Sequence, residues 1–97
     1  MNLLTDREKI REICEQNGIN FLALFGSFSR GEAGRESDID LLVEFIDPNT
    51  SLFKHVAVEA NLEKEFGIKV DLVTRRSLHP YLRDHILKDL KVLYEGR

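Results

Sequence analysis

The sequence predicts an α/β (α+β) fold in which a small mixed sheet of about four strands packs against helices. Two observations carry this prediction. Segments with the apolar spacing of helices alternate with short β-type runs along the chain, an order typical of helix and sheet layers. The chain has 97 residues, enough for one sheet and a few helices around one core. We therefore expect residues 1–97 to form a single domain.

The first helix is expected to begin near Asp6. Thr5, followed by Glu8 three residues later, matches a capping box, in which each side chain bonds a backbone amide of the other residue. Gly18 should end the helix, because glycine takes the left-handed conformation at little cost. The apolar positions of the helix follow the i, i+3, i+4 spacing of one face: Ile10, Ile13 and Cys14.

Two β-type runs follow. The run from Asn20 to Phe25 is almost wholly apolar, as expected of a central strand that is covered on both faces. The run from Asp38 to Phe45 alternates, so that its residues divide between two faces. One face carries Ile39, Leu41, Val43 and Phe45. The other carries Asp38, Asp40, Leu42 and Glu44.

A second helix is expected after a turn at Asp47-Pro48-Asn49. Ser51 can cap this helix, and Gly67 should stop it after Phe66. One apolar stripe should face the sheet: Val58, Leu62 and Phe66. We interpret a second stripe as further core, with a partner surface as the alternative: Phe53, Val56, Ala57 and Ala60.

The last part of the chain predicts a strand, a helix and a closing strand. In the strand Lys69–Thr74, Asp71 lies on the face opposite to that of Val70 and Leu72. A helix should begin near Pro80, capped by Ser77 or His79, because proline is favoured at the first helical position. Residues 91–94 predict the short closing strand.

Composition and charge exclude several classes of protein. Apolar residues make up 42% of the chain and charged residues 32%, as in a soluble globular domain. A formal net charge of −3 gives no indication of nucleic-acid binding. Because no signal peptide and no long apolar run are present, we expect a cytoplasmic protein without membrane contact. Cys14, the single cysteine, is interpreted as a buried structural thiol.

The segment GSFSRGEAGRESDIDLLVEF, residues 26–45, carries the main candidate site. Gly26 and Ser27 follow an apolar strand, where backbone amides and a hydroxyl can receive phosphate oxygens. Asp38 and Asp40 share one face of the next strand, within reach of the same cations. Asp71 joins them, as a third metal ligand or as a base, if its strand lies beside theirs.

Arginines near this segment are candidate phosphate contacts. Arg30 is the first of these, and the others are Arg35, Arg75 and Arg76. Arginines on loops also pair with neighbouring acids, so the alternative for each is an exposed ion pair. The three histidines lack the spacing of metal ligands and are interpreted as surface or capping residues: His55, His79 and His85.

The Gly26-Ser27 pair, ten intervening residues and Asp38-Ile39-Asp40 resemble the signature of the polymerase-β-like nucleotidyltransferase superfamily. The short chain and the stretches SRG, SDIDLLVEF and KVDLVT resemble its minimal nucleotidyltransferase branch (MNT, MntA-like). Members of that branch are typically antitoxins paired with HEPN-domain toxins. The resemblance extends from about Phe21 to Tyr94.

The resemblance implies roles for these residues. Gly26 and Ser27 would hold the phosphates of ATP, with Arg30 as a further nucleotide contact. The catalytic carboxylates would ligate Mg²⁺, two ions being expected: Asp38, Asp40 and Asp71. The implied reaction moves AMP from ATP to a hydroxyl and releases pyrophosphate.

The resemblance also implies a biological role, that of the antitoxin in a type VII HEPN/MNT toxin–antitoxin system. The acceptor would be a tyrosine of the partner HEPN toxin, and the two proteins would form a hetero-oligomer. The chain has no room for an added acceptor-binding domain, so a partner or a second copy should complete the site. Two alternatives remain: an antitoxin that acts by binding without catalysis, and a nucleotidyltransferase for a small-molecule acceptor.

Overall fold

The structure, a computed structural model, describes residues 6–26 and 39–96. Within these ranges four strands form one sheet in the order β3-β2-β1-β4. β1 is antiparallel to β2 and β4, and β2 is parallel to β3. The elements are α1 (Arg7–Gln16), β1 (Ile19–Phe25), β2 (Ile39–Phe45), α2 (Leu52–Phe66), β3 (Val70–Thr74), the 3₁₀ helix η2 (Arg75–Ser77), α3 (Pro80–Lys88) and β4 (Lys91–Glu95).

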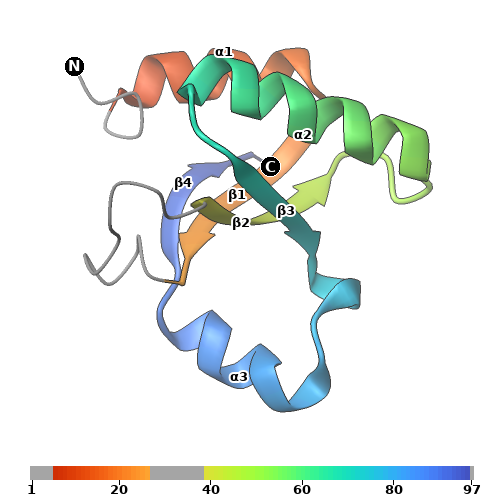
Figure 1. Cartoon of the computed structure of the whole chain (residues 1–97), viewed down its shortest axis with the longest axis vertical. Helices are drawn as coiled ribbons and strands as arrows, with labels where there is room; N and C mark the ends of the chain where they lie inside the picture. The colour runs from red at the N-terminus through yellow and green to blue at the C-terminus, as the bar shows by residue number, and fades with distance from the viewer. Residues whose placement is uncertain (1–5, 27–38, 97) are drawn as a thin grey trace.

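The helices cover the two sides of the sheet unequally. α1 and α2 lie together over one face, and α3 lies on the opposite side (Figure 1). β1 and β2 occupy the middle of the sheet, as expected for a buried central strand. The predicted α/β architecture with a mixed four-stranded sheet is confirmed. None of the helices in the described ranges combines the length and the apolar character that a membrane span requires.

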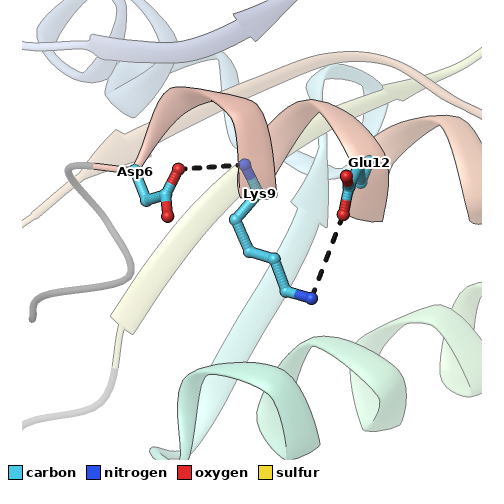
Figure 2. Close-up of polar contacts among 3 residues, drawn as sticks. All are labelled: Asp6, Lys9 and Glu12. Atoms are coloured by element: carbon cyan, nitrogen blue, oxygen red, sulfur yellow. Dashed lines mark hydrogen bonds and ion pairs between the residues drawn. The ribbon is translucent and has the colours of Figure 1, made fainter.

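α1 begins beside Asp6 as predicted, but its N-cap differs from the prediction. Asp6 is the N-cap, and its side chain accepts a hydrogen bond of 3.1 Å from the backbone amide of Lys9 (Figure 2). The capping box of Thr5 and Glu8 is therefore wrong, since the cap is one residue later; Thr5 itself lies outside the described residues. Aspartate caps a helix as well as threonine does, and its negative charge favours the N-terminal end.

The remaining turns and caps agree with the sequence. Gly18 and Gly67 follow α1 and α2 in the left-handed region, each with a φ of 67°. The Ser51 hydroxyl caps α2 by accepting from the Lys54 amide at 3.1 Å. His79 caps α3 by accepting from the Tyr81 amide at 3.2 Å, directly before Pro80. η2 was not predicted. The Asp47 turn is also present, closed by hydrogen bonds from residues 49 and 50.

The core lies between the sheet and the two helices α1 and α2. The strands contribute Leu22, Leu24, Ile39, Leu41, Val43, Val70 and Leu72. The helices contribute Ile10, Ile13, Cys14, Val58 and Leu62. Phe45 and Phe66 pack against this cluster. The predicted alternation of residues 39–45 is confirmed for the face that packs on the core.

The second apolar stripe of α2 is not core. Phe53 is 90% exposed and Val56 is 55% exposed, and Ala57 and Ala60 are also exposed. The interpretation as further core is wrong, because α2 lies flat on one face of the sheet and can bury only the stripe that faces it. The alternative interpretation of this stripe, a partner surface, stays a prediction.

The free edge of β3 is closed by side chains. The amide of Val70 donates to the Glu63 carboxylate at 3.0 Å, and that of Leu72 donates to Glu59 at 2.9 Å. The amide of Thr74 donates to the Ser77 hydroxyl at 3.1 Å. The unpaired backbone amides of an edge strand can pair with a strand of another chain and so lead to aggregation. In β3 these amides are already bonded to side-chain acceptors. They also hold β3 in place beside β2.

Candidate functional site

Asp40 and Asp71 face each other across neighbouring strands. In the parallel pairing of β2 with β3, Asp40 is the register partner of Asp71, and Leu41 is the partner of Leu72. Register partners point to the same face of a sheet, and adjacent residues point to opposite faces. Since Leu41 and Leu72 are buried in the core, the two aspartates lie on the side away from α1 and α2. The sequence predicted that Asp71 would join the site if its strand lay beside the strand of Asp40, and the two strands are indeed neighbours.

Gly26 places the end of β1 against the same carboxylate. Phe25 pairs with Asp40, so Gly26 follows at the next position of the neighbouring strand. A Cβ atom at Gly26 would collide with Oδ2 of Asp40. The φ of Gly26 is +76°, a conformation that side chains other than glycine rarely adopt. Both the backbone conformation and the space therefore require glycine at this position.

The structure thus brings together three of the predicted site residues: Gly26, Asp40 and Asp71. The other three lie outside the described residues: Ser27, Arg30 and Asp38. Arg35, a lesser candidate, also lies outside them. Their roles stay predictions.

The chemistry of Asp40 and Asp71 fits a divalent cation. Asp71 is exposed and Asp40 is half-buried, so both can reach a ligand from the same side of the sheet. Two carboxylates at neighbouring positions repel each other unless a cation lies between them. Within residues 6–26 and 39–96, no cluster of three or more acidic, histidine or cysteine ligands occurs. Two carboxylates completed by substrate phosphates are a usual set for Mg²⁺.

Arg75 is engaged elsewhere on the same face. It forms an ion pair of 3.6 Å with Glu44. Glu44 lies four residues beyond Asp40, at the far end of β2, where a cavity of about 330 Å³ is lined in part by Glu44, Arg75 and Arg76. This cavity is at the opposite strand ends from the two aspartates, so it is separate from their site. The structure therefore favours the ion-pair interpretation for Arg75 over a phosphate contact.

Cys14 and His79 behave as predicted, whereas His55 does not, because it is half-buried and caps no helix. Burial raises the pKa of the Cys14 thiol to about 12, with a further contribution from Glu15, so the thiol stays protonated and unreactive near neutral pH. His79 is a helix cap. His55 is half-buried and donates from Nε2 to the Leu72 carbonyl at 2.7 Å, which joins α2 to β3. These residues support the fold.

Comparisons with known proteins agree with the fold and the site. The family model of the nucleotidyltransferase domain matches residues 7–93. The protein adenylyltransferase MntA of Thermococcus cleftensis is 37% identical over 89 residues, which are 92% of this chain and 87% of that protein.

Two solved structures resemble the chain closely. A chain of a toxin–antitoxin crystal structure with AMP-PNP has a TM-score of 0.76 and 28% identity, and the match covers 95% of this chain and 75% of that one. A chain from the complex of the tri-AMPylated Shewanella oneidensis HEPN toxin with its MNT antitoxin has a TM-score of 0.69 and 26% identity, over 99% of this chain and 74% of that one. Sequence and fold agree over nearly the whole chain, and the protein belongs to the nucleotidyltransferase domain family, in its minimal, MntA-like branch.

Proposed function

We propose that this nucleotidyltransferase is the antitoxin of a HEPN/MNT pair and a Mg²⁺-dependent protein adenylyltransferase. It moves AMP from ATP to a tyrosine hydroxyl of its partner HEPN toxin and releases pyrophosphate. The observation that carries this proposal is the direct pairing of Asp40 with Asp71 beside Gly26. The similarity to a protein adenylyltransferase and to a complex with a tri-AMPylated toxin supports the choice of acceptor class.

The residues have separate tasks in the proposed reaction. Asp40 and Asp71, with Asp38, would hold Mg²⁺, which when bound neutralises negative charge on the phosphates. Gly26 lets the backbone pass close to the Asp40 carboxylate, and the Ser27 hydroxyl and nearby amides bind phosphate oxygens. The acceptor oxygen forms a bond to the α-phosphorus of ATP while the bond from that phosphorus to pyrophosphate breaks. Asp71, an exposed carboxylate, would take the proton of the hydroxyl.

We expect the acceptor hydroxyl to come from another protein. Asp71 lies on an exposed part of the sheet, open to a side chain of another protein. The solved neighbours include complexes of an antitoxin with a HEPN toxin. A tyrosine on a partner can therefore supply the acceptor hydroxyl.

Mass spectrometry of the partner toxin tests the proposal. Incubation of the complex with ATP and Mg²⁺ should add one or more AMP masses to a toxin tyrosine, and Asp40→Asn should abolish the addition. Gly67→Ala serves as a control, because a Cβ atom at Gly67, which follows α2, would meet nothing within 4 Å. A partner that stays unmodified with every nucleoside triphosphate would contradict the enzymatic proposal.

The second candidate is neutralisation by contact alone. The exposed stripe of α2 favours it, because exposed apolar patches often mark protein interaction sites. Protection of cells by a variant with all three aspartates changed to asparagine separates the two functions. A fully protective variant would assign neutralisation to binding, and a variant that binds the toxin but does not protect would assign it to AMP transfer.

A further inference from the structure

Arg83 carries a buried donor that no residue in the described part of the chain satisfies. The Nε atom of Arg83 is buried and is without a hydrogen-bond partner among the described residues. Arg83 also makes no ion pair within the described part of the chain, whereas Arg11 and Arg75 each pair with a glutamate. A buried charged donor that lacks a partner costs more than an ordinary lost hydrogen bond. Such a group in a native fold calls for a specific explanation.

The helix that carries Arg83 faces the side of the sheet where the two aspartates lie. α3 connects β3 to β4, which are the two edges of the sheet, and it lies on the side opposite to α1 and α2 (Figure 1). Asp40 and Asp71 point to that same side, because their neighbours Leu41 and Leu72 point into the core.

Arg83 lies on the inward face of α3. The half-buried positions of this helix and of the residues after it follow helical spacing: Arg83, Ile86, Leu87 and Leu90. The opposite face carries exposed residues, among them Tyr81, Asp84 and Lys88. The Arg83 side chain is thus half-buried, and its Nε atom is buried on the side of the sheet that holds Asp40 and Asp71.

A nucleotide phosphate would satisfy this donor. Arginine is suited to phosphate because its planar guanidinium presents several N–H donors in a fixed fork and stays charged when partly buried. The three aspartates and a bound triphosphate together carry more negative charge than two divalent cations balance. A cation fixed on the facing helix balances the remainder. A lysine would be less suitable, since it lacks the Nε–H that is buried here.

We infer that Arg83 is a phosphate-binding residue of the same site, its Nε–H donating to a phosphate oxygen of the bound nucleotide. This inference rests on the proposed function for the identity of the ligand. It adds to the predicted site a residue from α3, the helix on the side of the sheet where Asp40 and Asp71 lie.

Calorimetric titration with AMP-PNP in the presence of Mg²⁺ tests the inference without the transfer reaction. Arg83→Met keeps the apolar stem and removes the donors, and it should weaken binding about 10- to 100-fold, as expected for a charge-assisted hydrogen bond. Lys88→Met, an exposed cation of the same helix, is the matched control and should change affinity by no more than about twofold. Adenosine, which has no phosphate, should bind all three proteins alike.

A second variant covers the case in which Arg83→Met does not fold. Arg83→Lys keeps the charge and loses the Nε–H, and it should still bind AMP-PNP less tightly than the wild type. Equal affinity of the wild type and of either folded Arg83 variant would overturn the inference.

The outcomes separate this inference from the proposed function. A wild-type protein that binds AMP-PNP through Arg83 but transfers no AMP to its partner would contradict the function and leave the phosphate contact in place. A wild-type protein that transfers AMP, with an Arg83→Met variant that binds AMP-PNP normally, would contradict only the contact.

Discussion

The two faces of the sheet differ in what they hold. The face under α1 and α2 is apolar and closed, and its strand residues, such as Leu41 and Leu72, are almost inaccessible. The face toward α3 presents the neighbouring carboxylates of Asp40 and Asp71, one half-buried and one exposed. Each strand contributes to both faces through adjacent residues. A residue that stabilises the core and a residue of the candidate site are therefore direct neighbours in each of these two strands.

This separation follows from the pleat of a β-strand, in which successive side chains point to opposite sides. Asp71 and Leu72 share one stretch of backbone, and that backbone is anchored by the bond from the Leu72 amide to Glu59. The packing of Leu72 in the core consequently fixes the position of the Asp71 carboxylate on the opposite face. Three substitutions test how independent the two faces are.

The largest effect is expected for Asp71→Asn. The substitution keeps the size of the side chain and removes its charge, so metal binding and proton uptake should both suffer. We expect AMP transfer to the partner to fall about 10²- to 10⁴-fold. Because Asp71 is exposed and asparagine relieves repulsion with Asp40, the urea midpoint should be unchanged or slightly raised. A marked loss of stability would show that the two faces are not independent.

Leu72→Ala should have the converse effect. Leu72 is 3% exposed in the core, and a large-to-small change there costs about 2–5 kcal/mol of unfolding free energy, through lost burial and a residual cavity. Urea denaturation measures this loss. At temperatures where the variant is fully folded, the rate of AMP transfer should stay near that of the wild type. A variant that is folded but inactive would mean that core packing tunes the position of Asp71.

The third substitution, Gly26→Ala, compares two glycines with similar backbone conformations. Gly26 has a φ of +76° and Gly67 a φ of +67°, so alanine at either position costs about 1–2 kcal/mol of stability. At Gly67 a Cβ meets nothing within 4 Å, and at Gly26 it collides with the Asp40 carboxylate. Only Gly26→Ala should also reduce AMP transfer, by about 10²-fold. Equal activity of the two variants would contradict the role given to the contact.

Local patterns in the sequence were sufficient for much of the fold. Alternation in residues 39–45 predicted which side chains enter the core, and spacing predicted the buried stripe of α2. Ser51 and the two glycines that follow α1 and α2 were correctly identified as a cap and as stops, because these signals depend on neighbouring backbone groups. For α3 the sequence left Ser77 and His79 as alternative caps, and the structure has His79. The Thr5 cap was wrong because the adjacent Asp6 is an equally good cap, which local patterns do not separate.

Features that depend on distant contacts were not predictable in this way. The exposed stripe of α2 has the same apolar spacing as a buried one, and only the absence of a covering element among the described residues distinguishes it. The acceptors Glu59 and Glu63 look like ordinary helix-surface charges until β3 lies beside them. Arg83 likewise looks like an ordinary surface cation in the sequence, and the burial of its Nε atom depends on the position of α3 beside the sheet.

The sequence by itself determined the residue types of the site, the faces of its strands and the family resemblance. The residue types show which ligands they can bind, and side chains alternate between the two faces of a strand. Both signals can be read from a few neighbouring residues. The tertiary structure alone decided that Asp40 and Asp71 are register partners and that Gly26 touches the Asp40 carboxylate. Strand order and register are set by the packing of the whole core, because only the complete set of apolar contacts distinguishes one pairing of strands from another.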